Sequence, residues 1–523
     1  MGTYFNPDNR SFRKDRNNKV YVDKTGLLEF LNSKIETSSN CISVSHARRF
    51  GKSHAAGMID AYYSLGSDSL ELFSDTEIAT KDDFKEHLNK YNVIHLDIST
   101  FLDFYKDNIT EKITEYLYDE FREVFGEKID YTKNISAVLM QIYRETCTMF
   151  VVIIDEWDCV IRNCADDEKL VRKYLQFLHA LFKSEESKNF LALAYITGIL
   201  PIKKINDESA LNNFREYSMV KAKPITKYFG FTEDEVRNLC EKYDMDFETM
   251  KSWYNGYLID GEHMYNPNSV CCAIENDDYD SYWKNTSSFA SINTFITLNY
   301  EGLKDDILNM LAGNKVMVEV GNFQNDLSKI ESKDDAITAL IHLGYLGYDK
   351  DSLSAYVPNF EVAKAFQMAL RVGKWSEVSK SISRCDELLM ATINLESDKV
   401  AQLIELAHET YTSIIKYNDE NSLSCVLTMA YFTAPAYYNV IRELPSGKGF
   451  ADLTLIPRAN VGRKPAMIIE LKYDKTAESA IKQIKEKHYQ GALAGYDGEI
   501  LLVGINYDEK TKEHSCVIEK YEN

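Results

Sequence analysis

The stretch C-I-S-V-S-H-A-R-R-F-G-K-S-H-A-A-G-M-I-D-A-Y-Y, residues 41–63, decides the fold of the first half of the chain. Its first five residues are small or apolar and predict a buried strand, and its last ten predict a helix. Between them, Gly51-Lys52-Ser53 closes a loop, which is the context of a phosphate-binding loop. In such a loop, backbone N–H groups hold phosphate, the lysine reaches the β- and γ-phosphates, and the hydroxyl ligates Mg²⁺.

The loop departs from the pattern G-x-x-x-x-G-K-[ST] at its first position, where His46 replaces glycine. Because a bare G-K-S also occurs at ordinary helix starts, the loop alone leaves both interpretations open. The stretch M-F-V-V-I-I-D-E (149–156) favours the phosphate site, because it is an apolar strand that ends in two acids, the Walker B arrangement. Asp155 would hold Mg²⁺ through water, and Glu156 would polarise the attacking water. Alone, the two acids could equally be solvated carboxylates.

Three further polar features complete the predicted site. Thr197 follows an apolar strand and would sense the γ-phosphate, although a plain strand-end role is the alternative. Arg48 and Arg49 are expected to neutralise transition-state charge, whereas Arg215 is expected to be a surface residue. The predicted nucleotide-binding residues are Arg48, Arg49, Phe50, Gly51, Lys52, Ser53, Asp155 and Thr197, with Glu156 catalytic and with Ser53 and Asp155 on the metal.

Secondary-structure patterns divide the chain. Apolar runs of four to seven residues at Cys41–Ser45, Val93–Ile98, Phe150–Ile154 and Phe190–Ile196 alternate with longer amphipathic stretches, which predicts βα units and a parallel sheet. From about residue 226 the pattern becomes helical, opening with Thr232 and Glu235 as a capping box. After about residue 400 a helical stretch precedes two hairpin-like strands, 451–456 and 466–471, a Lys-rich helix, a strand at 499–504 and a polar tail.

Length and composition narrow the class of protein. The chain has 523 residues and a mass of 60.1 kDa, enough for about three or four domains. With 45% hydrophobic and 27% charged residues, disordered and low-complexity classes are excluded. No apolar run approaches the roughly 18–20 residues of a membrane span, and the start has no secretory h-region, so we expect a cytoplasmic protein without a membrane partner. The ten cysteines form no C-x-x-C pair and are expected to be reduced.

Charge is unevenly distributed. The 60 Lys and Arg against 81 Asp and Glu give a net charge of −21, which argues against nonspecific phosphate binding by the whole protein. Residues 441–490, however, hold ten Lys and Arg against six Asp and Glu, a net of +4. This segment is where we expect contact with nucleic acid.

The same segment carries a second candidate site. Asp452 lies on one predicted strand, and Glu470 and Lys472 lie on the next. Residues i and i+2 of a strand share a face, so Glu470 and Lys472 should point the same way. Two converging carboxylates suit Mg²⁺, or Mn²⁺, and a lysine can orient water or stabilise charge, which is the chemistry of metal-assisted phosphodiester hydrolysis. Gln483, on the following helix, is expected to join the catalytic residues.

Alternatives to this second site stay open. By itself, E-L-K is a common charge alternation on the wet face of an edge strand, and the order Asp, E-x-K and basic helix within about 40 residues is what favours a site. Lys482, Lys485 and Lys487 would supply positive charge for a nucleic-acid backbone. Tyr489 is also offered by this helix, and Glu420 is a weaker candidate for a third carboxylate.

At these residues the chain resembles bacterial AAA-ATPase-like proteins with a C-terminal PD-(D/E)XK nuclease-superfamily domain. The resemblance covers nearly the whole chain. It includes ARRFGKS and IIDEWD together with YVDKTGLLEFL (21–31), ITGIL (196–200), LNNF (211–214), WYNGY (253–257), YNP (265–267), NDENSLSCVL (418–427), GKGFADL (447–453) and IIELKY (468–473). The family's loop usually has Arg-Pro where this chain has His46-Ala47.

The resemblance implies an α/β multidomain protein. Its parts would be a P-loop NTPase domain with a parallel sheet and flanking helices (1–225), a helical lid and linker region (226–400), and a restriction-endonuclease-like α/β domain (401–523). It further implies ATP at Lys52, Ser53, Asp155 and Glu156, and a metal ion at Asp452, Glu470 and Lys472.

Three functions fit these observations. The first is an ATP-dependent nuclease that acts on DNA, the second is a nucleotide-gated module that binds nucleic acid or protein without cutting it, and the third is an ATPase that remodels a protein partner. The joint presence of Asp452, Glu470 and Lys472 speaks against the third. The oligomeric state stays open, although an arginine acting in trans would require a homo-oligomer.

Overall fold

A computed structural model describes most of the chain. The described residues are 2–202, 211–282, 292, 295, 300, 302–324, 327, 330–372, 376–411, 420–434, 437–446, 449–457, 464–487, 493 and 496–521. They form two compact units. The first comprises residues 1–245, 255–278 and 318–354, and the second comprises 246–254, 279–317 and 355–523. The division at residues 225 and 400 that the sequence indicates stays a prediction.

The first unit is built on a parallel sheet of five strands in the order β2-β3-β4-β1-β5. The strands are β1 (Cys41–Ser45), β2 (Asn92–Asp97), β3 (Phe150–Asp155), β4 (Leu191–Gly198) and β5 (Arg215–Ser218). Four of them match the apolar runs in the sequence, which confirms the predicted parallel sheet. The fifth, β5, was not predicted.

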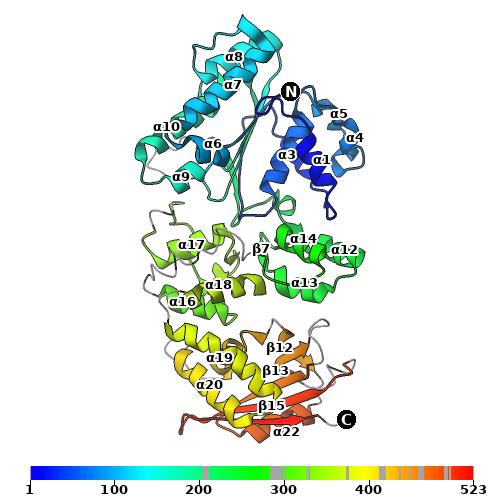
Figure 1. Cartoon of the computed structure of the whole chain (residues 1–523), viewed down its shortest axis with the longest axis vertical. Helices are drawn as coiled ribbons and strands as arrows, with labels where there is room; N and C mark the ends of the chain where they lie inside the picture. The colour runs from blue at the N-terminus through cyan, green and yellow to red at the C-terminus, as the bar shows by residue number, and fades with distance from the viewer. Residues whose placement is uncertain are drawn as a thin grey trace. The chain divides into compact units, whose positions relative to one another are not determined.

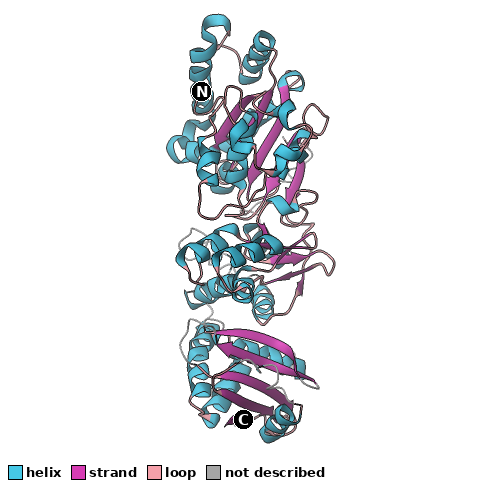
Figure 2. Ribbon diagram, turned by 90° about the vertical axis from the view of Figure 1, so that its right-hand side faces the viewer, coloured by secondary structure: helices cyan, strands magenta, loops and turns pink. Residues whose placement is uncertain are grey.

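Helices cover both faces of this sheet (Figure 1, Figure 2). One face carries α1 (Arg10–Arg16), α2 (Gly26–Asn32), α3 (Lys52–Tyr63), α4 (Leu70–Phe73) and α5 (Phe84–His87). The other carries α6 (Ile98–Tyr105), α7 (Ile109–Phe125), α8 (Ile135–Thr146), α9 (Cys159–Asn163), α10 (Glu168–Lys183) and α11 (Ser187–Phe190).

The apolar run of β3 shows why the strands read as continuous hydrophobic segments. Val151 and Ile153 pack into the core with α3, whereas Val152 and Ile154 pack into the core with α7 and α10. Side chains of a strand alternate between faces, so a strand with helices on both faces is apolar throughout. The carboxyl ends of β1, β2, β3 and β4 meet at one edge, where open α/β sheets bind their ligands.

The rest of the first unit contains a small antiparallel sheet in the order β6-β8-β7. Its strands are β6 (Phe231–Thr232), β7 (Tyr257–Ile259) and β8 (Glu262–Tyr265), and the helices are α12 (Glu233–Tyr243), α14 (Pro267–Asn276) and α17 (Lys333–Leu343). Thr232 and Glu235 form the predicted capping box at the start of α12. The short strand β10 (Gly347–Asp349) also belongs to this unit, whereas β9 (Val316–Met317) belongs to the second unit and β11 (Ser354–Tyr356) begins at the last residue of the first.

The second unit contains a mixed sheet in the order β12-β13-β14-β15-β16. The strands are β12 (Tyr438–Ser446), β13 (Gly449–Pro457), β14 (Ala466–Tyr473), β15 (Ile500–Tyr507) and β16 (His514–Lys520). Strands β13 and β14 are antiparallel, as the hairpin pattern predicts, and β14 and β15 are parallel. Residues 514–520 form an edge strand, so the prediction of a polar tail after residue 504 was wrong.

Helices of the second unit are α13 (Phe247–Tyr254), α16 (Leu303–Leu311), α18 (Phe360–Val372), α19 (Ser376–Ile393), α20 (Ser397–Tyr411), α21 (Glu420–Ala430) and α22 (Ala477–Glu486). Helix α20 packs on β16, and α22 packs on β14 and β15. None of the described helices in either unit is long and apolar enough to cross a membrane. The predicted fold class, a P-loop-type parallel sheet followed by a helical region and a C-terminal α/β domain, is confirmed.

Candidate functional site

The loop between β1 and α3 has the backbone that a phosphate-binding loop needs. Arg49 has φ 68° and Gly51 has φ 88°, so the chain turns twice through the left-handed region before the helix begins. Glycine adopts this region at little cost. Gly51 is the N-cap of α3 and, being glycine, has no side chain with which to cap this helix end. The first backbone N–H groups of α3 are therefore not taken by a cap, and a helix N-terminus of this kind attracts anions.

Lys52 lies buried at the base of the loop. Its Nζ donates hydrogen bonds to the carbonyl oxygens of His46 at 2.9 Å and Ala47 at 3.0 Å. Burial lowers the pKa of Lys52, and the nearby carboxylates of Glu156 and Asp155 oppose this effect. The ammonium thus faces the acidic end of β3, as a lysine that balances phosphate and metal charge should.

His46 occupies the position where the phosphate-loop pattern has glycine. Its ring is fully buried and stacks on Phe229, with ring centroids 5.1 Å apart. Burial, with a smaller effect from Lys52, lowers the pKa of His46 to about 3, so the ring is neutral. Neither ring nitrogen has a hydrogen-bond partner among the described residues. The His46 ring therefore packs as an apolar side chain, and the backbone carbonyl of His46 accepts a hydrogen bond from Lys52.

The predicted acids meet at the carboxyl edge of the sheet. Asp155 is buried at the end of β3, where its Oδ1 accepts hydrogen bonds from the Thr197 hydroxyl and from the backbone N–H of Glu156. Asp97, at the end of β2, is the register partner of Asp155. The structure therefore brings Asp155 and Thr197 together, although they are 42 residues apart.

Glu156 is held by an arginine that the sequence did not reveal. The Nη2 atom of Arg162, on α9, lies 3.0 Å from Glu156 Oε2. The Arg162 Nε atom lies 3.7 Å from Asp158 Oδ2, which also accepts hydrogen bonds from the backbone of Ile199 and Leu200. Burial raises the pKa of Glu156. The positive charges of Lys52 and Arg162 lower this pKa, whereas the negative charge of Asp158 raises it. The only available signal was D-E-W-D followed by an arginine four residues later.

One open cleft with a volume of about 520 Å³ lies at this edge of the sheet, and Thr197 is not among the residues that line it. Its lining includes seven predicted residues, namely Arg48, Arg49, Gly51, Lys52, Ser53, Asp155 and Glu156. The cleft also includes Arg162 and Asp97. Phe50 does not line it, because its ring is buried against Tyr257. Arg215 is exposed at the start of β5, opposite Ile42, and lies outside the cleft lining, as expected.

The second candidate site lies on the sheet of the second unit. The Oδ2 atom of Asp452, on β13, accepts a hydrogen bond of 2.7 Å from the backbone N–H of Leu471. On β14, the Nζ atom of Lys472 lies 2.9 Å from Glu470 Oε1 and donates to the Leu471 carbonyl at 2.9 Å. Glu470 and Lys472 share a face, and Leu471 is buried on the other. The structure thus brings the three predicted residues together.

Helix α22 supplies the fourth predicted residue. The Nε2 atom of Gln483 donates to Glu470 Oε1, the same oxygen that Lys472 contacts. The helix reaches this position because Gly504 on β15 has no side chain. A Cβ there would lie 3.1 Å from Ala480 Cβ and 3.0 Å from Ile481 Cγ1.

The electrostatics of this site suit a cation. Burial, and next the charge of Asp452, raise the pKa of Glu470 to about 7, whereas Lys472 opposes the shift. Glu470 Oε2 is buried and has no hydrogen-bond partner among the described residues. An unpartnered buried carboxylate oxygen beside a second carboxylate fits an oxygen-preferring divalent cation. No cluster of three or more His, Cys, Asp or Glu side chains with metal-site geometry occurs in the described part of the chain, so Asp452 and Glu470 would need water or other oxygens as further ligands.

Two lysines of the basic helix α22 have acidic partners at the surface. Lys482 lies 3.6 Å from Glu486, and Lys485 pairs with Glu519. Tyr489 lies outside the described residues. Glu420 is the first residue of α21.

Two family models match the chain. Residues 10–206 match the model described as "Predicted AAA-ATPase", and residues 418–516 match the model of the PD-(D/E)XK nuclease superfamily. The first match contains the loop and the cleft acids, and the second contains Asp452, Glu470, Lys472 and Gln483.

Individual proteins are also similar. A protein of Azotobacter chroococcum mcd 1, described as "Uncharacterized protein in vnfD 5'region", is 23% identical over 513 residues, covering 94% of this chain and 93% of its own length. The Aeropyrum pernix ORC2 protein, solved as ADPNP–ADP complexes, is 12% identical and covers 70% of this chain and 99% of its own, with a TM-score of 0.25, at which the likeness supports no inference. By its two family matches, the chain combines an AAA-ATPase-like domain with a C-terminal PD-(D/E)XK nuclease-superfamily domain, which confirms the resemblance identified in its sequence.

Proposed function

We propose that the protein binds and hydrolyses ATP in the cleft at the loop and cleaves phosphodiester bonds of DNA at the site around Glu470. The domain boundaries near residues 225 and 400, and a cytoplasmic location, belong to the same proposal. The observation that supports it most is that each unit brings its own set of predicted residues into contact. Asp155 contacts Thr197 in the first unit, and Glu470 contacts Lys472 in the second, where Asp452 lies on the neighbouring strand.

At the first site the chain's own groups have distinct tasks. The N–H groups at the start of α3 and the side chains of Arg48 and Arg49 would hold the phosphates. Lys52 would leave the carbonyls of His46 and Ala47 and contact the β- and γ-phosphates. Mg²⁺, when bound by Ser53 and by Asp155 through water, would neutralise phosphate charge.

Glu156 would act as the general base at this site. Its carboxylate would accept a proton from the attacking water, and Thr197 would keep Asp155 oriented through the hydroxyl contact. Because burial raises the pKa of Glu156, the carboxylate is a stronger base than a solvated one.

At the second site Asp452 and Glu470 would hold a divalent cation, Mg²⁺ or Mn²⁺, which as a Lewis acid would polarise the phosphate. Lys472 would orient the hydrolytic water or stabilise developing charge on the phosphate oxygens. Gln483 would fix the Glu470 carboxylate through its present hydrogen bond. Residues 441–490, with their net positive charge, would guide the nucleic-acid backbone.

A cleavage assay tests this proposal. Wild-type protein is incubated with single- and double-stranded DNA and RNA, with Mg²⁺ or Mn²⁺, and with or without ATP, alongside Glu470→Gln and Lys52→Ala. We expect metal-dependent DNA cleavage that Glu470→Gln abolishes while ATP hydrolysis continues, and loss of ATP hydrolysis in Lys52→Ala. The exposed residues Glu478 and Lys85 provide matched controls, Glu478→Gln and Lys85→Ala, which should leave both activities unchanged. Cleavage that persists in Glu470→Gln would contradict the nuclease assignment.

The ion pairs on the basic helix favour a second candidate function. Because Lys482 and Lys485 already have acidic partners and the whole chain carries a net charge of −21, this surface attracts phosphate weakly. In this case the protein would be a nucleotide-gated module that binds nucleic acid or protein, with an inactive nuclease-like domain. ATP hydrolysis without cleavage under any metal condition, together with salt-sensitive DNA binding that weakens in Lys482→Gln, would favour it over the nuclease.

A further inference from the structure

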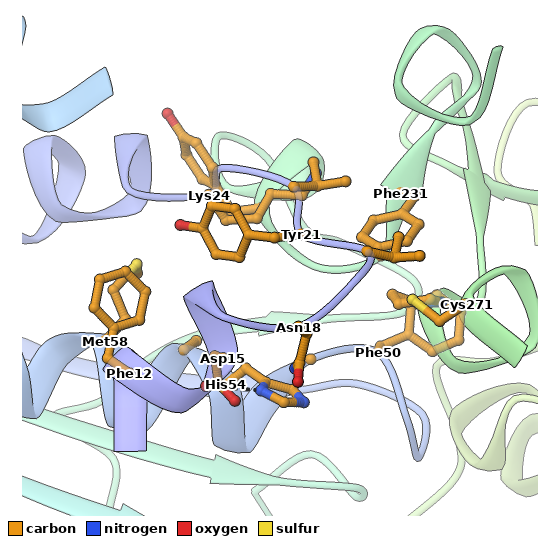
Figure 3. A pocket seen from close by; sticks show the side chains of 17 residues that line it. Phe12, Asp15, Asn18, Tyr21, Lys24, Phe50, His54, Met58, Phe231 and Cys271 are labelled. Atoms are coloured by element: carbon orange, nitrogen blue, oxygen red, sulfur yellow. Dashed lines mark ion pairs between the residues drawn. The ribbon is translucent and has the colours of Figure 1, made fainter. Parts of the chain in front are cut away.

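Aromatic side chains gather in two places in the first unit. One group, which includes Phe12, Tyr21 and Phe50, lines a cavity beside the loop (Figure 3). The other group lies on α6, on α7 and in the N-terminal segment, over the opposite face of the sheet from α3. We call this second group the aromatic surface, and its members are Tyr4, Phe101, Phe104, Tyr105 and Tyr116.

The rings of the aromatic surface contact one another. The centroid of the Tyr4 ring lies 5.1 Å from that of Phe101 and 5.9 Å from that of Tyr116. The hydroxyl oxygens of Tyr105 and Tyr116 are 2.7 Å apart, so a hydrogen bond joins these two rings. Phe104 contacts this group only through Tyr105, at a centroid distance of 6.3 Å, and is 75% exposed. The group therefore ends in an apolar ring that stands in solvent.

Negative charge surrounds the aromatic surface. Residues 98–125 hold seven Asp and Glu against three Lys and Arg, a net charge of −4, and two of the three cations already pair with acids of α7. Asp103 and Asp107 flank Phe104 in the sequence, are exposed, and form no ion pair with any residue that the structure describes. An exposed ring between unpaired acids repels polyanions and attracts a partner with both apolar and cationic groups.

One lysine of the chain already makes the contacts that such a partner would make. The Nζ atom of Lys112 lies 5.8 Å from the centre of the Tyr105 ring and 2.8 Å from Glu115 Oε2. An ammonium over an aromatic ring is attracted by the ring, and a carboxylate beside it adds a second attraction. A lysine or arginine of a partner would meet the same combination of ring and carboxylate at Phe104.

Residues other than Phe104 hold α6 in place. Asp97 caps the helix, because its Oδ1 accepts a hydrogen bond of 2.9 Å from the N–H of Ser99. Phe101 and Leu102 are buried in the core beneath the helix. The fold therefore gains little from Phe104, and its exposed ring is available to a partner. Because Asp97 and Ser99 also line the cleft, such a partner would contact the helix that starts at the candidate ATP site.

We propose that the aromatic surface is the docking site for a segment of another protein that carries both basic and apolar side chains. The choice of partner rests on charge complementarity, since the acids around Phe104 favour lysine and arginine and disfavour nucleic acid and acidic membranes. The inference goes beyond the ATP and DNA chemistry proposed above and does not depend on it, because neither site uses a residue of the aromatic surface.

Fluorescence anisotropy with the full chain tests the proposal. The probe is a labelled peptide made of two repeats of Leu-Lys-Lys-Leu-Leu-Lys-Leu, in which a helix places the leucines on one face and the lysines on the other. One comparison peptide has glutamate in place of every lysine, and another has serine in place of every leucine. We expect the probe to bind at least about tenfold more tightly than either comparison peptide, because both parts of the surface contribute.

Variants of the aromatic surface remove its apolar and its charged part in turn. Phe104→Ser removes the exposed ring, and the double variant Asp103→Asn/Asp107→Asn removes the charge beside it. We expect each to weaken probe binding at least about fivefold and to leave thermal unfolding unchanged, because all three side chains are exposed. Wild-type affinity in Phe104→Ser would overturn the docking site.

Matched controls make the same changes at exposed residues over the opposite face of the sheet. They are Leu70→Ser and the double variant Glu71→Gln/Asp82→Asn, and both should keep the wild-type affinity within about twofold. Losses in the controls as large as those in the test variants would mean that the probe is attracted by the acidic protein as a whole, which overturns the docking site.

Two further measurements identify the place and the occupant. A probe with a benzophenone at one end should photocrosslink to residues 98–125, as read by mass spectrometry, and crosslinks confined to other segments would overturn the site. Light scattering of wild-type protein tests a second copy of this chain as the occupant, since its own helix α1 is basic. A mass that rises with concentration in wild type but not in Phe104→Ser would show that the surface binds another copy, which overturns its assignment to a different protein.

Discussion

Gly504 is the register partner of Glu470 across the parallel strands β15 and β14. The absence of a side chain at Gly504 lets α22 lie close to the sheet, and α22 carries Gln483, whose amide contacts Glu470. A residue that takes no part in chemistry therefore sets the distance between the helix and the candidate metal-binding carboxylate.

We expect Gly504→Ala to push α22 away from the sheet. Its Cβ would collide with the Ala477 carbonyl oxygen and crowd Ile481 and Ala480. Overpacking of this kind costs about 1–3 kcal/mol of stability. Hydrogen exchange should become faster in residues 477–486, and the Gln483–Glu470 contact should be lost. Gly321→Ala is the control, because its nearest neighbour is a Glu319 side-chain atom 3.4 Å away; equal exchange in the two variants would contradict the prediction.

The stability of the second unit should depend on the ionisation of Glu470. Burial and the nearby Asp452 raise its pKa from 4.5 to about 7. Between these values the folded state binds the proton and the unfolded state does not, so this contribution to stability is complete below pH 4.5 and is lost as the pH rises to about 7. Glu470→Gln mimics the protonated form. In metal-free buffer at pH 8 the free energy of unfolding of this variant should exceed that of wild type by roughly 3 kcal/mol.

Urea unfolding at pH 5 and pH 8 with a chelator measures this effect. The advantage of Glu470→Gln should shrink toward pH 5, and the exposed control Glu478→Gln should follow wild type at both pH values. An advantage for Glu470→Gln that is the same at both pH values would show that something other than ionisation causes it.

Two buried histidines should make the same unit sensitive to acid. His408 on α20 and His514 on β16 have ring nitrogens 3.2 Å apart. Burial lowers their pKa values from 6.5 to about 4 and about 3. As the pH falls below 6.5 the unfolded state gains protons that the folded state cannot, so stability is lost by about 1.4 kcal/mol per pH unit for each histidine.

Replacing one histidine should halve this loss. Urea unfolding of His514→Gln, followed by circular dichroism, measures the free energy of unfolding between pH 6 and pH 4.5. The loss of this free energy per pH unit that the two histidines cause in wild type should be about halved in the variant. His263→Gln changes an exposed histidine of the other unit and should leave the slope unaltered. A wild-type slope in His514→Gln would mean that His514 does not remain neutral in the folded protein.

Much of the fold could be predicted because local pattern and burial agree. The strands β1 to β4 are apolar on both faces, so their sequences identify them without knowledge of their partners. The capping box of Thr232 and Glu235 and the shared face of Glu470 and Lys472 likewise follow from spacing of three and of two residues.

The edge strands could not be predicted in this way. β5 has four residues, of which Arg215 is exposed, and its strand structure depends on pairing with β1. β16 carries polar side chains and is only partly buried, so its sequence resembles a tail until β15 lies beside it. Strand preference at such positions depends on the neighbouring strand more than on the residue type.

Arg162 escaped prediction for a related reason. The arginines of the loop adjoin the phosphate-binding motif in sequence, whereas Arg162 reaches the cleft only because α9 folds back over the end of β3. Pairing between an arginine and a carboxylate on different elements is a tertiary relationship, and spacing along the chain does not reveal it.

The contact between Arg162 and Glu156 leads to a prediction about the pH dependence of ATP hydrolysis. The guanidinium is largely buried, with 8% of the side chain exposed, and it lowers the pKa of Glu156 against the effect of burial. Arg162→Ala should therefore raise the pKa of Glu156, so that a larger fraction is protonated and unable to accept a proton from water. The acidic limb of the pH–rate profile should therefore move to higher pH.

Steady-state kinetics separates this positioning role from simple loss of structure. At a pH on the acidic limb we expect kcat of Arg162→Ala to fall by up to about tenfold while the KM for ATP changes less than about threefold, because the lost charge changes the protonation of the general base more than it changes substrate binding. Arg162→Lys should move the acidic limb part of the way back toward its wild-type pH, because the lysine ammonium keeps the positive charge but lacks the planar guanidinium that can donate two parallel hydrogen bonds. Arg172, exposed on α10, provides the control Arg172→Ala. An acidic limb in Arg162→Ala that coincides with that of wild type would show that Arg162 does not set the protonation of Glu156.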